Sequence, residues 1–168
     1  VETMRMQLEN FLVGSIVKDI KVKTQNIVSG DFKKLIGQKV ISVRRFAKVS
    51  SIDFSNNFSL LTHVKLTGQF IYRGPNLNND GKLSKKVVGG LGGPHTHVIF
   101  EFSDGGILYY NDIRKFGWIR VMPTPDVENE KFVKTLGPEP FKDLTLEYFQ
   151  NLLSKSKRNI KVLLMDQS

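Results

Sequence analysis

The chain has 168 residues, of which 40% are hydrophobic and none is cysteine, and its formal net charge is +9. This length suits one ordinary domain with a sizeable core, while the lack of cysteine and of any apolar run of eighteen residues excludes disulfides, thiolate metal sites and a transmembrane helix. The positive charge favours a polyanionic partner such as nucleic acid, although charge alone leaves open a basic protein with no such partner.

The first predicted element is a helix over residues 2–13. Apolar residues recur there at helical spacing: Met4, Leu8, Phe11 and Leu12. Gly14 follows as a favourable C-cap, because glycine readily adopts the left-handed conformation that ends many helices.

From Ile16 to Val121 the pattern changes to short segments rich in β-branched and aromatic residues. Eight such segments are predicted strands: 16–23, 39–46, 49–54, 58–64, 68–72, 96–102, 106–112 and 117–121. Polar turn sequences separate several of them, including "FSNNF" and "FSDGG". This number and spacing of strands predicts a sandwich or barrel.

Two helices are predicted after the strands. One follows "LGPEP" (136–140) and carries an apolar stripe: Leu146, Phe149, Leu152 and Leu153. The other begins at Asn159 as N-cap and has no C-cap signal before the sequence ends. The predicted fold class is α+β, mostly β: a β-sandwich of about eight strands, flanked by an N-terminal helix and a helix after the sheet. We expect a sandwich domain over 1–140 and a helical connector over 141–168.

A long Gly-rich stretch, residues 73–94, interrupts the strands. It contains six Gly, two Pro and three Lys. Loops of this length are usually functional or disordered. A binding loop and a plain hairpin excursion both remain open.

The histidines give a weaker signal. His95 and His97 occupy alternate positions of a predicted strand, so both imidazoles share a face and could form a metal pair. No cysteine and no clustered carboxylates complete a ligand set. Local hydrogen bonds or phosphate contacts are therefore the favoured roles.

Two loops combine a cation, a large apolar residue and a glycine: Lys65–Leu66 with Gly68, and Arg114–Lys115–Phe116 with Gly117. A protein that extrudes a base from duplex DNA needs apolar wedges to replace it and cations to hold the backbone. The forked guanidinium of Arg114 suits the edge of the base left without its partner. The alternative is a charged hairpin with an incidental aromatic residue.

At these residues the chain resembles the N-terminal part of the formamidopyrimidine-DNA glycosylases of the bacterial MutM or Fpg type. The similar segments, in the family's order, are "VETMRMQLENFLVG", "LIGQKVISVRRFAK", "SLLTHVKLTGQF", "HTHVIFEFSDGGILYYNDIRKFG", "LGPEPF" and "IKVLLMDQ". The related endonuclease VIII branch opens differently and lacks this wedge arrangement.

The resemblance implies base-excision repair. The family removes 8-oxoguanine and formamidopyrimidines and then cuts the abasic site by β,δ-elimination. Its nucleophile is an N-terminal Pro, assisted by the following Glu, and both precede the Val-Glu-Thr with which this sequence opens. We therefore expect a fragment that lacks the nucleophile, the C-terminal helix–two-turn–helix and the zinc finger, and that is inactive alone. The alternative is a non-catalytic DNA-binding β-sandwich module.

The resemblance also assigns roles to single residues. Lys48 matches a hairpin lysine that contacts the phosphate beside the lesion and assists the chemistry, and His63 and His95 match histidines near the DNA backbone. Leu66 matches the first void-filling wedge, which is usually Met. The resemblance implies no cofactor or metal in this chain and zinc in the missing C-terminal part. It also implies damaged double-stranded DNA as the partner, no membrane association, a monomer and a cytoplasmic location.

The second loop matches the rest of the family's wedge. Arg114 and Phe116 match the other two void-filling residues. Lys115 stands where the family has a second Arg, so the charge is kept and the forked donor is lost. Ile113 replaces a common Pro, which predicts a less rigid loop.

Overall fold

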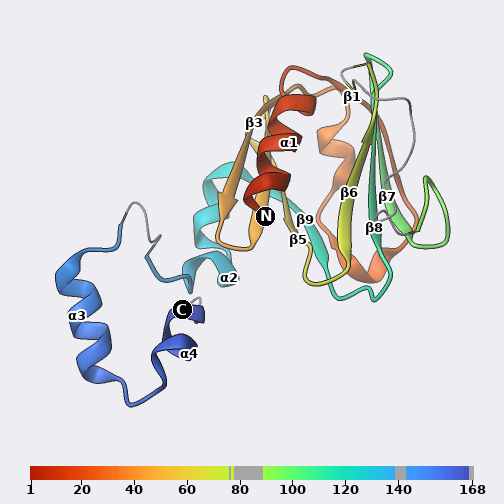
Figure 1. The fold of residues 1–168 in the computed structure, drawn as a ribbon. Helices are drawn as coiled ribbons and strands as arrows, with labels where there is room; N and C mark the ends of the chain where they lie inside the picture. Colours follow the sequence, from red (N-terminus) through yellow and green to blue (C-terminus); the bar gives the residue numbers. More distant parts are fainter. Residues whose placement is uncertain (76, 78–88, 139–142, 167–168) are drawn as a thin grey trace. The chain divides into compact units, whose positions relative to one another are not determined.

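The computed structural model describes residues 1–75, 77, 89–138 and 143–166. These form two compact units, Val1–Val127 and Glu128–Ser168. The first unit is a β-sandwich with one leading helix, and the second contains short helices (Figure 1).

The first unit contains most of the regular structure. Its helix is α1 (Glu2–Leu12), and its strands are β1 (Val17–Val22), β2 (Val28–Ser29), β3 (Val40–Phe46), β4 (Val49–Phe54), β5 (Phe58–His63), β6 (Gly68–Arg73), β7 (Thr96–Phe102), β8 (Ile107–Asp112) and β9 (Trp118–Pro123). Short 3-10 helices are η1 (Gln25–Ile27), η2 (Phe32–Leu35) and η3 (Thr124–Asn129), the last of which runs into the second unit. The second unit has α2 (Lys131–Lys134), α3 (Leu146–Lys155) and α4 (Ile160–Met165).

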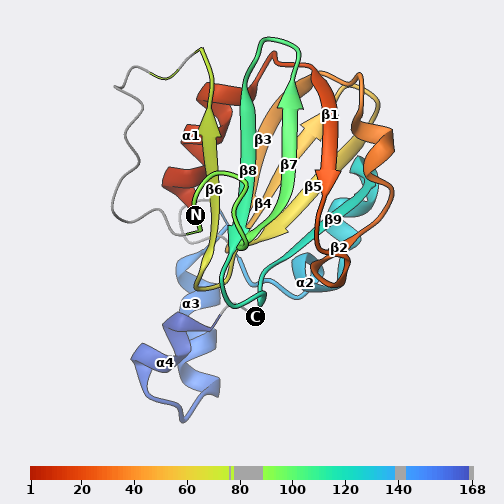
Figure 2. The same cartoon turned by 90° about the vertical axis from the view of Figure 1, so that its right-hand side faces the viewer.

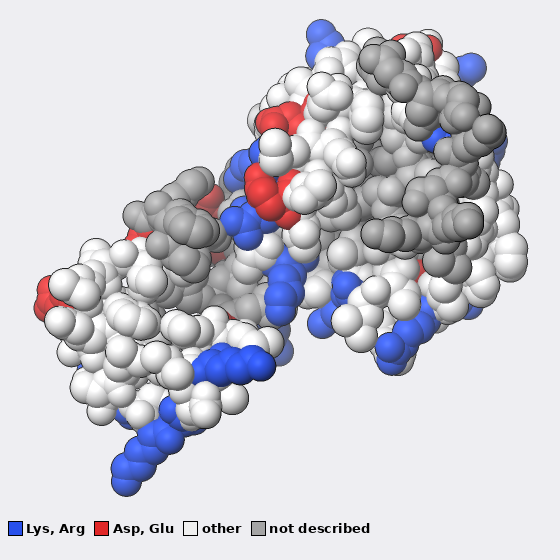
Figure 3. Space-filling model, in the orientation of Figure 1, with Lys and Arg blue, Asp and Glu red and all other residues white. Residues whose placement is uncertain are grey.

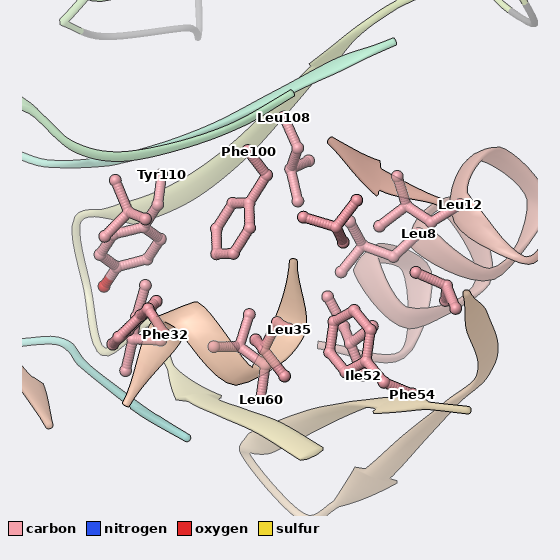
Figure 4. Close-up of a cluster of buried hydrophobic side chains, with 14 of the residues drawn as sticks. Leu8, Leu12, Phe32, Leu35, Ile52, Phe54, Leu60, Phe100, Leu108 and Tyr110 are labelled. Carbon is pink, nitrogen blue, oxygen red and sulfur yellow. The ribbon is translucent and has the colours of Figure 1, made fainter. Parts of the chain in front are cut away.

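Two sheets face each other in the sandwich. The order of one is β1-β7-β8-β6 and that of the other is β2-β9-β5-β4-β3. All the strand pairs are antiparallel except β2 with β9. The inward residues interdigitate between the sheets, as Phe100 and Leu108 do from one sheet and Ile52 and Leu60 from the other (Figure 4).

Helix α1 lies beside the sheet edges formed by β3 and β6 (Figure 2). Its Leu8 and Leu12 are buried in the core, and burial of each contributes about 1.5–3 kcal/mol. The ring of Phe11 stacks on Tyr72 of β6 at a centroid distance of 5.0 Å. The Arg5 guanidinium donates to the carbonyl of Val43 in β3. The helix is therefore attached to both sheets.

The structure confirms the predicted fold class. The predicted helix 2–13 ends one residue early, at Leu12, and Gly14 has the expected positive φ of 96°. Each of the eight predicted strands is present within two residues of its predicted ends. The prediction missed β2, because a strand of two residues is too short to show periodicity.

The second unit contains both predicted helices. Thr145 caps α3 by accepting from the amide of Tyr148, and Asn159 caps α4 by accepting from the amide of Lys161. The predicted apolar stripe of α3 is only half buried at Phe149 and Leu152, and no residue of α3 is fully buried.

Candidate nucleic-acid interface

Strand register brings three loops to one end of the sandwich. Val49 pairs with His63, and His63 pairs with Trp118. In the other sheet Gly68 pairs with Asp112. The β3–β4, β5–β6 and β8–β9 loops therefore meet at this end, the lower one in Figure 1. We call residues 46–49, 63–68 and 112–118 the basic end.

The charge of the basic end is strongly positive. Its cations are Lys48, Lys65, Arg114 and Lys115, all exposed, and its one acidic residue, Asp112, is buried. Figure 3 shows Lys and Arg side chains at this lower end of the sandwich. A surface with this balance attracts phosphates.

The β3–β4 turn presents Lys48. The turn has two residues, because Phe46 pairs with Val49 across it. Ala47 has a φ of 49°, a left-handed conformation that costs a non-glycine residue roughly 1–2 kcal/mol. The guanidinium of Arg45 donates from Nη1 to the Ala47 carbonyl at 3.2 Å. The strained turn thus has a side-chain brace.

The β5–β6 loop carries a buried histidine and an exposed leucine. Leu66 is 82% exposed. Lys65 beside it has a φ of 51°. Its amide donates to Nδ1 of His63 at 3.0 Å, which leaves the proton of a neutral imidazole on Nε2.

The surroundings of His63 favour the neutral ring. Burial, followed by the positive charges of Lys65 and Lys48, lowers the pKa of His63 to about 4. The ring also lies against Trp118, with centroids 6.0 Å apart. At neutral pH this histidine is a neutral hydrogen-bond donor among cations.

The β8–β9 loop exposes an arginine stacked on a phenylalanine. The guanidinium carbon of Arg114 lies 4.6 Å from the ring centroid of Phe116, and Phe116 is 59% exposed. Lys115 between them has a φ of 55°. Left-handed non-glycine residues gather at functional sites because the surrounding structure compensates their strain.

The Asp112 carboxylate holds two of the loops together. The carboxylate accepts from the hydroxyl of Thr67, from the amide of Arg114 at 3.2 Å and from the amide of Gly117 at 2.8 Å. Asp112 is 0% exposed. Asp112 therefore braces the β8–β9 turn and joins it to the β5–β6 loop through Thr67.

Two glycines let the loops close over Tyr110. A Cβ on Gly117 would lie 2.1 Å from the Tyr110 hydroxyl, and a Cβ on Gly68 would lie 2.4 Å from the Val64 carbonyl oxygen. No side chain fits at such distances. The two glycines therefore allow the loop backbones to approach their protein neighbours closely.

His95, just before β7, and His97, within β7, have different surroundings. His97 is buried, accepts or donates at Nδ1 with Thr24 and donates from Nε2 to the Asp112 carbonyl at 2.7 Å. Of the two expected roles, local hydrogen bonding and phosphate contact, the structure shows local hydrogen bonding for His97. His95 is half buried, and its carbonyl accepts from the amide of Asp112, so its backbone adjoins the basic end.

Some functional features carried no sequence signal. Thr67 and Arg45 gain their roles from partners on other elements, which spacing along the chain does not reveal. Residues 76 and 78–88 of the predicted 73–94 loop lie outside the described residues. Within the described part of the chain no group of His, Asp and Glu could hold a metal ion. No helix among the described residues is long and apolar enough to cross a bilayer.

Comparison with known proteins decides the family. The model of the formamidopyrimidine-DNA glycosylase N-terminal domain matches residues 1–119. The chain belongs to this family. The match covers α1 and the strands that carry the basic end, up to the start of β9.

Relatives of the glycosylase family extend further than this chain. The formamidopyrimidine-DNA glycosylase of Rickettsia massiliae is 36% identical over 174 residues, which cover 99% of this chain and 56% of the relative. That of Pediococcus pentosaceus is 37% identical and is covered to 58%. The chain thus spans a little over half the length of these curated relatives.

Solved glycosylase structures share the fold. The Lactococcus lactis enzyme in complex with DNA that contains FAPY-dG has a TM-score of 0.79 and 29% identity, with 99% of this chain and 59% of that chain covered. The same enzyme with DNA that contains an abasic site has a TM-score of 0.80 and 29% identity, with the same coverage.

Proposed function

We propose that the complete protein is a DNA glycosylase that excises oxidised purines, 8-oxoguanine and formamidopyrimidine, in base-excision repair. The observation that carries the proposal is the exposure of Leu66 and of the stacked Arg114–Phe116 pair on the basic end of a chain of this family. Exposed apolar residues ringed by cations suit a DNA duplex from which one nucleotide has been extruded.

The three exposed side chains divide the work of filling the gap. Leu66 and Phe116 replace the stacking of the extruded base, and Arg114 donates to the edge of the base left unpaired. The stacking of Arg114 on Phe116 orders both side chains before DNA binds, so less conformational entropy is lost on binding. The short, strained loops contribute to the same preorganisation.

The phosphates are held by the residues around these wedges. Lys48 contacts the phosphate beside the lesion, and Lys115 and His95 contact the backbone nearby. His63 donates from Nε2 as a neutral ring, because its pKa of about 4 leaves it uncharged at pH 7. Its contribution to binding is therefore a directed hydrogen bond, whereas the lysines release counterions.

Strand cleavage completes the proposed reaction. We place the nucleophile, the secondary amine of an N-terminal Pro, outside the 168 residues, with a Glu beside it as acid–base catalyst. The amine displaces the oxidised base from deoxyribose C1′, opening of the sugar ring gives a Schiff base, and β,δ-elimination then breaks the C–O bonds to both flanking phosphates. Family membership implies a zinc finger, which we place outside the 168 residues. We expect a monomer in the cytoplasm.

Borohydride trapping on a duplex with 8-oxoguanine tests the proposal. The complete protein should form a covalent adduct and should release the oxidised base, and residues 1–168 alone should form no adduct. An adduct with residues 1–168 alone would place the nucleophile within them. Binding without base release by the complete protein would instead indicate a non-catalytic DNA-binding module.

A further inference from the structure

Arg45 joins three parts of the sandwich unit. Its Nε lies 2.8 Å from Oε2 of Glu2 in the first turn of α1. Its Nη1 donates to the carbonyl of Ala47 at 3.2 Å, in the turn that presents Lys48. Arg45 itself belongs to β3, so one guanidinium connects the start of α1, strand β3 and the β3–β4 turn.

Glu2 is held in place from its other side. Its Oε1 accepts from Nε of Arg5 at 2.8 Å, and Arg5 also donates to Glu9 and to the Val43 carbonyl. The hydrogen bond from Arg5, together with the charges of Arg5 and Arg45, lowers the pKa of Glu2. The carboxylate that faces Arg45 is therefore both ionised and oriented at neutral pH.

The hydrogen bond from Arg45 to the Ala47 carbonyl fixes the orientation of the peptide unit between Ala47 and Lys48. The carbonyl of Ala47 and the amide of Lys48 belong to one peptide unit, which is planar. Ala47 holds its φ of 49° without the freedom of glycine. A donor fixed on this carbonyl therefore sets the direction in which the Lys48 side chain leaves the turn.

The pair is poorly suited to a role in stability. Side chains of Arg45 and Glu2 are 27% and 51% exposed, and ion pairs this open contribute little to folding. The forked geometry is what a lysine at position 45 cannot reproduce, because one ammonium cannot replace the rigidly spaced Nε and Nη1 donors.

We propose that Arg45, oriented by Glu2, is a positioning residue that directs Lys48 at the DNA phosphate beside the lesion. The inference rests on the proposed function and extends it to residues that touch no DNA. Arg45 acts through the turn, so its loss matters only while Lys48 is present.

The experiment compares variants of the complete protein: Arg45→Lys, Glu2→Gln, Lys48→Ala and the double variant Arg45→Lys/Lys48→Ala. Single-turnover excision of 8-oxoguanine, the salt dependence of duplex binding and the melting temperature are measured. Glu101→Gln is the matched control, because it breaks an exposed ion pair with Lys21 on the β1–β7 strands, away from the basic end.

Arg45→Lys should slow excision on the order of tenfold, as expected for a small misplacement of a catalytic contact, with the melting temperature changed by less than about 2 °C. Glu2→Gln should slow it less, and Glu101→Gln not at all. The double variant should be no slower than Lys48→Ala. A wild-type rate for Arg45→Lys, or equal slowing by it in both backgrounds, would overturn the proposal. If the wild-type protein excises no base, the proposed function fails, and the positioning role of Arg45 is then tested by the salt dependence of DNA binding alone. Arg45→Lys must lower the slope of that dependence as Lys48→Ala does; an unchanged slope would overturn the positioning role too.

Discussion

Replacing Asp112 by Asn gives the sharpest test of how the wedge loops are held. The buried carboxylate accepts from the Thr67 hydroxyl and from the amides of Arg114 and Gly117. An Asn side chain has one acceptor oxygen. If that oxygen takes the place of Oδ1, the Gly117 amide loses its partner; if it takes the place of Oδ2, the Arg114 amide keeps only its 3.3 Å hydrogen bond to the Thr67 hydroxyl and faces the Asn amide group. An unsatisfied buried donor costs about 1–3 kcal/mol. For a chain of 168 residues this lowers the melting temperature by about 2–12 °C.

The Asp112→Asn variant should lose more excision activity than its lower melting temperature alone would explain. Both loops depend on the same carboxylate, so the Asn variant should lose Leu66 and Phe116 as wedges together. The fluorescence of 2-aminopurine placed opposite the lesion rises when the opposite nucleotide leaves the base stack. In Asp112→Asn both the amplitude of this rise and the single-turnover excision rate should be lower than in the wild type. Asp104→Asn is the control, because Asp104 braces the β7–β8 turn at the other end of β8 through the amide of Gly106. Equal melting temperatures and fluorescence for wild type and Asp112→Asn would refute this account of the loops.

Further predictions concern single side chains. Phe116→Ala should change the free energy of unfolding by less than about 0.5 kcal/mol, because Phe116 is exposed, yet should slow excision in single-turnover assays; unchanged excision would remove Phe116 from the wedge. Lys48→Ala should reduce the slope of log binding constant against log salt by about 1, measured by fluorescence anisotropy, and an unchanged slope would exclude a phosphate contact. Urea titrations should show stability falling as pH drops from about 6.5 to 4, by at most about 1.4 kcal/mol per pH unit from His63, because the unfolded ring binds a proton before the folded one does. His63→Gln should remove that part of the decline, and an equally steep decline in the variant would contradict the depressed pKa. Leu12→Ala should destabilise the sandwich unit by about 2–5 kcal/mol in the same titrations, and a loss below about 1 kcal/mol would contradict its place in the core.

The strands were predictable because each has a buried face. Val98, Phe100 and Phe102 alternate along β7 and all are buried, so the period of two in the sequence reports the core directly. The turn at Gly105 was equally visible, since its φ of 86° requires a residue that tolerates the left-handed region. Local signals of this kind depend on neighbouring residues alone.

The candidate site was only partly predictable, because its geometry depends on contacts between residues far apart in the sequence. The sequence places Leu66 and Phe116 in loops with cations and glycines, but their loops join through Asp112 and Thr67, which are 45 residues apart. The neutrality of His63 depends on burial, and the braced turn at Ala47 depends on a guanidinium from β3. Such features arise from tertiary contacts, which no periodicity encodes.

A structure of the complete protein bound to a duplex with a stable abasic analogue would show whether the basic end holds the gap left by an extruded nucleotide. In that structure Leu66, Arg114 and Phe116 should occupy the gap in the base stack, and Nζ of Lys48 should lie within hydrogen-bonding distance of a phosphate beside the lesion. DNA bound to another face of the sandwich, or an intact stack with these side chains left in solvent, would contradict this prediction.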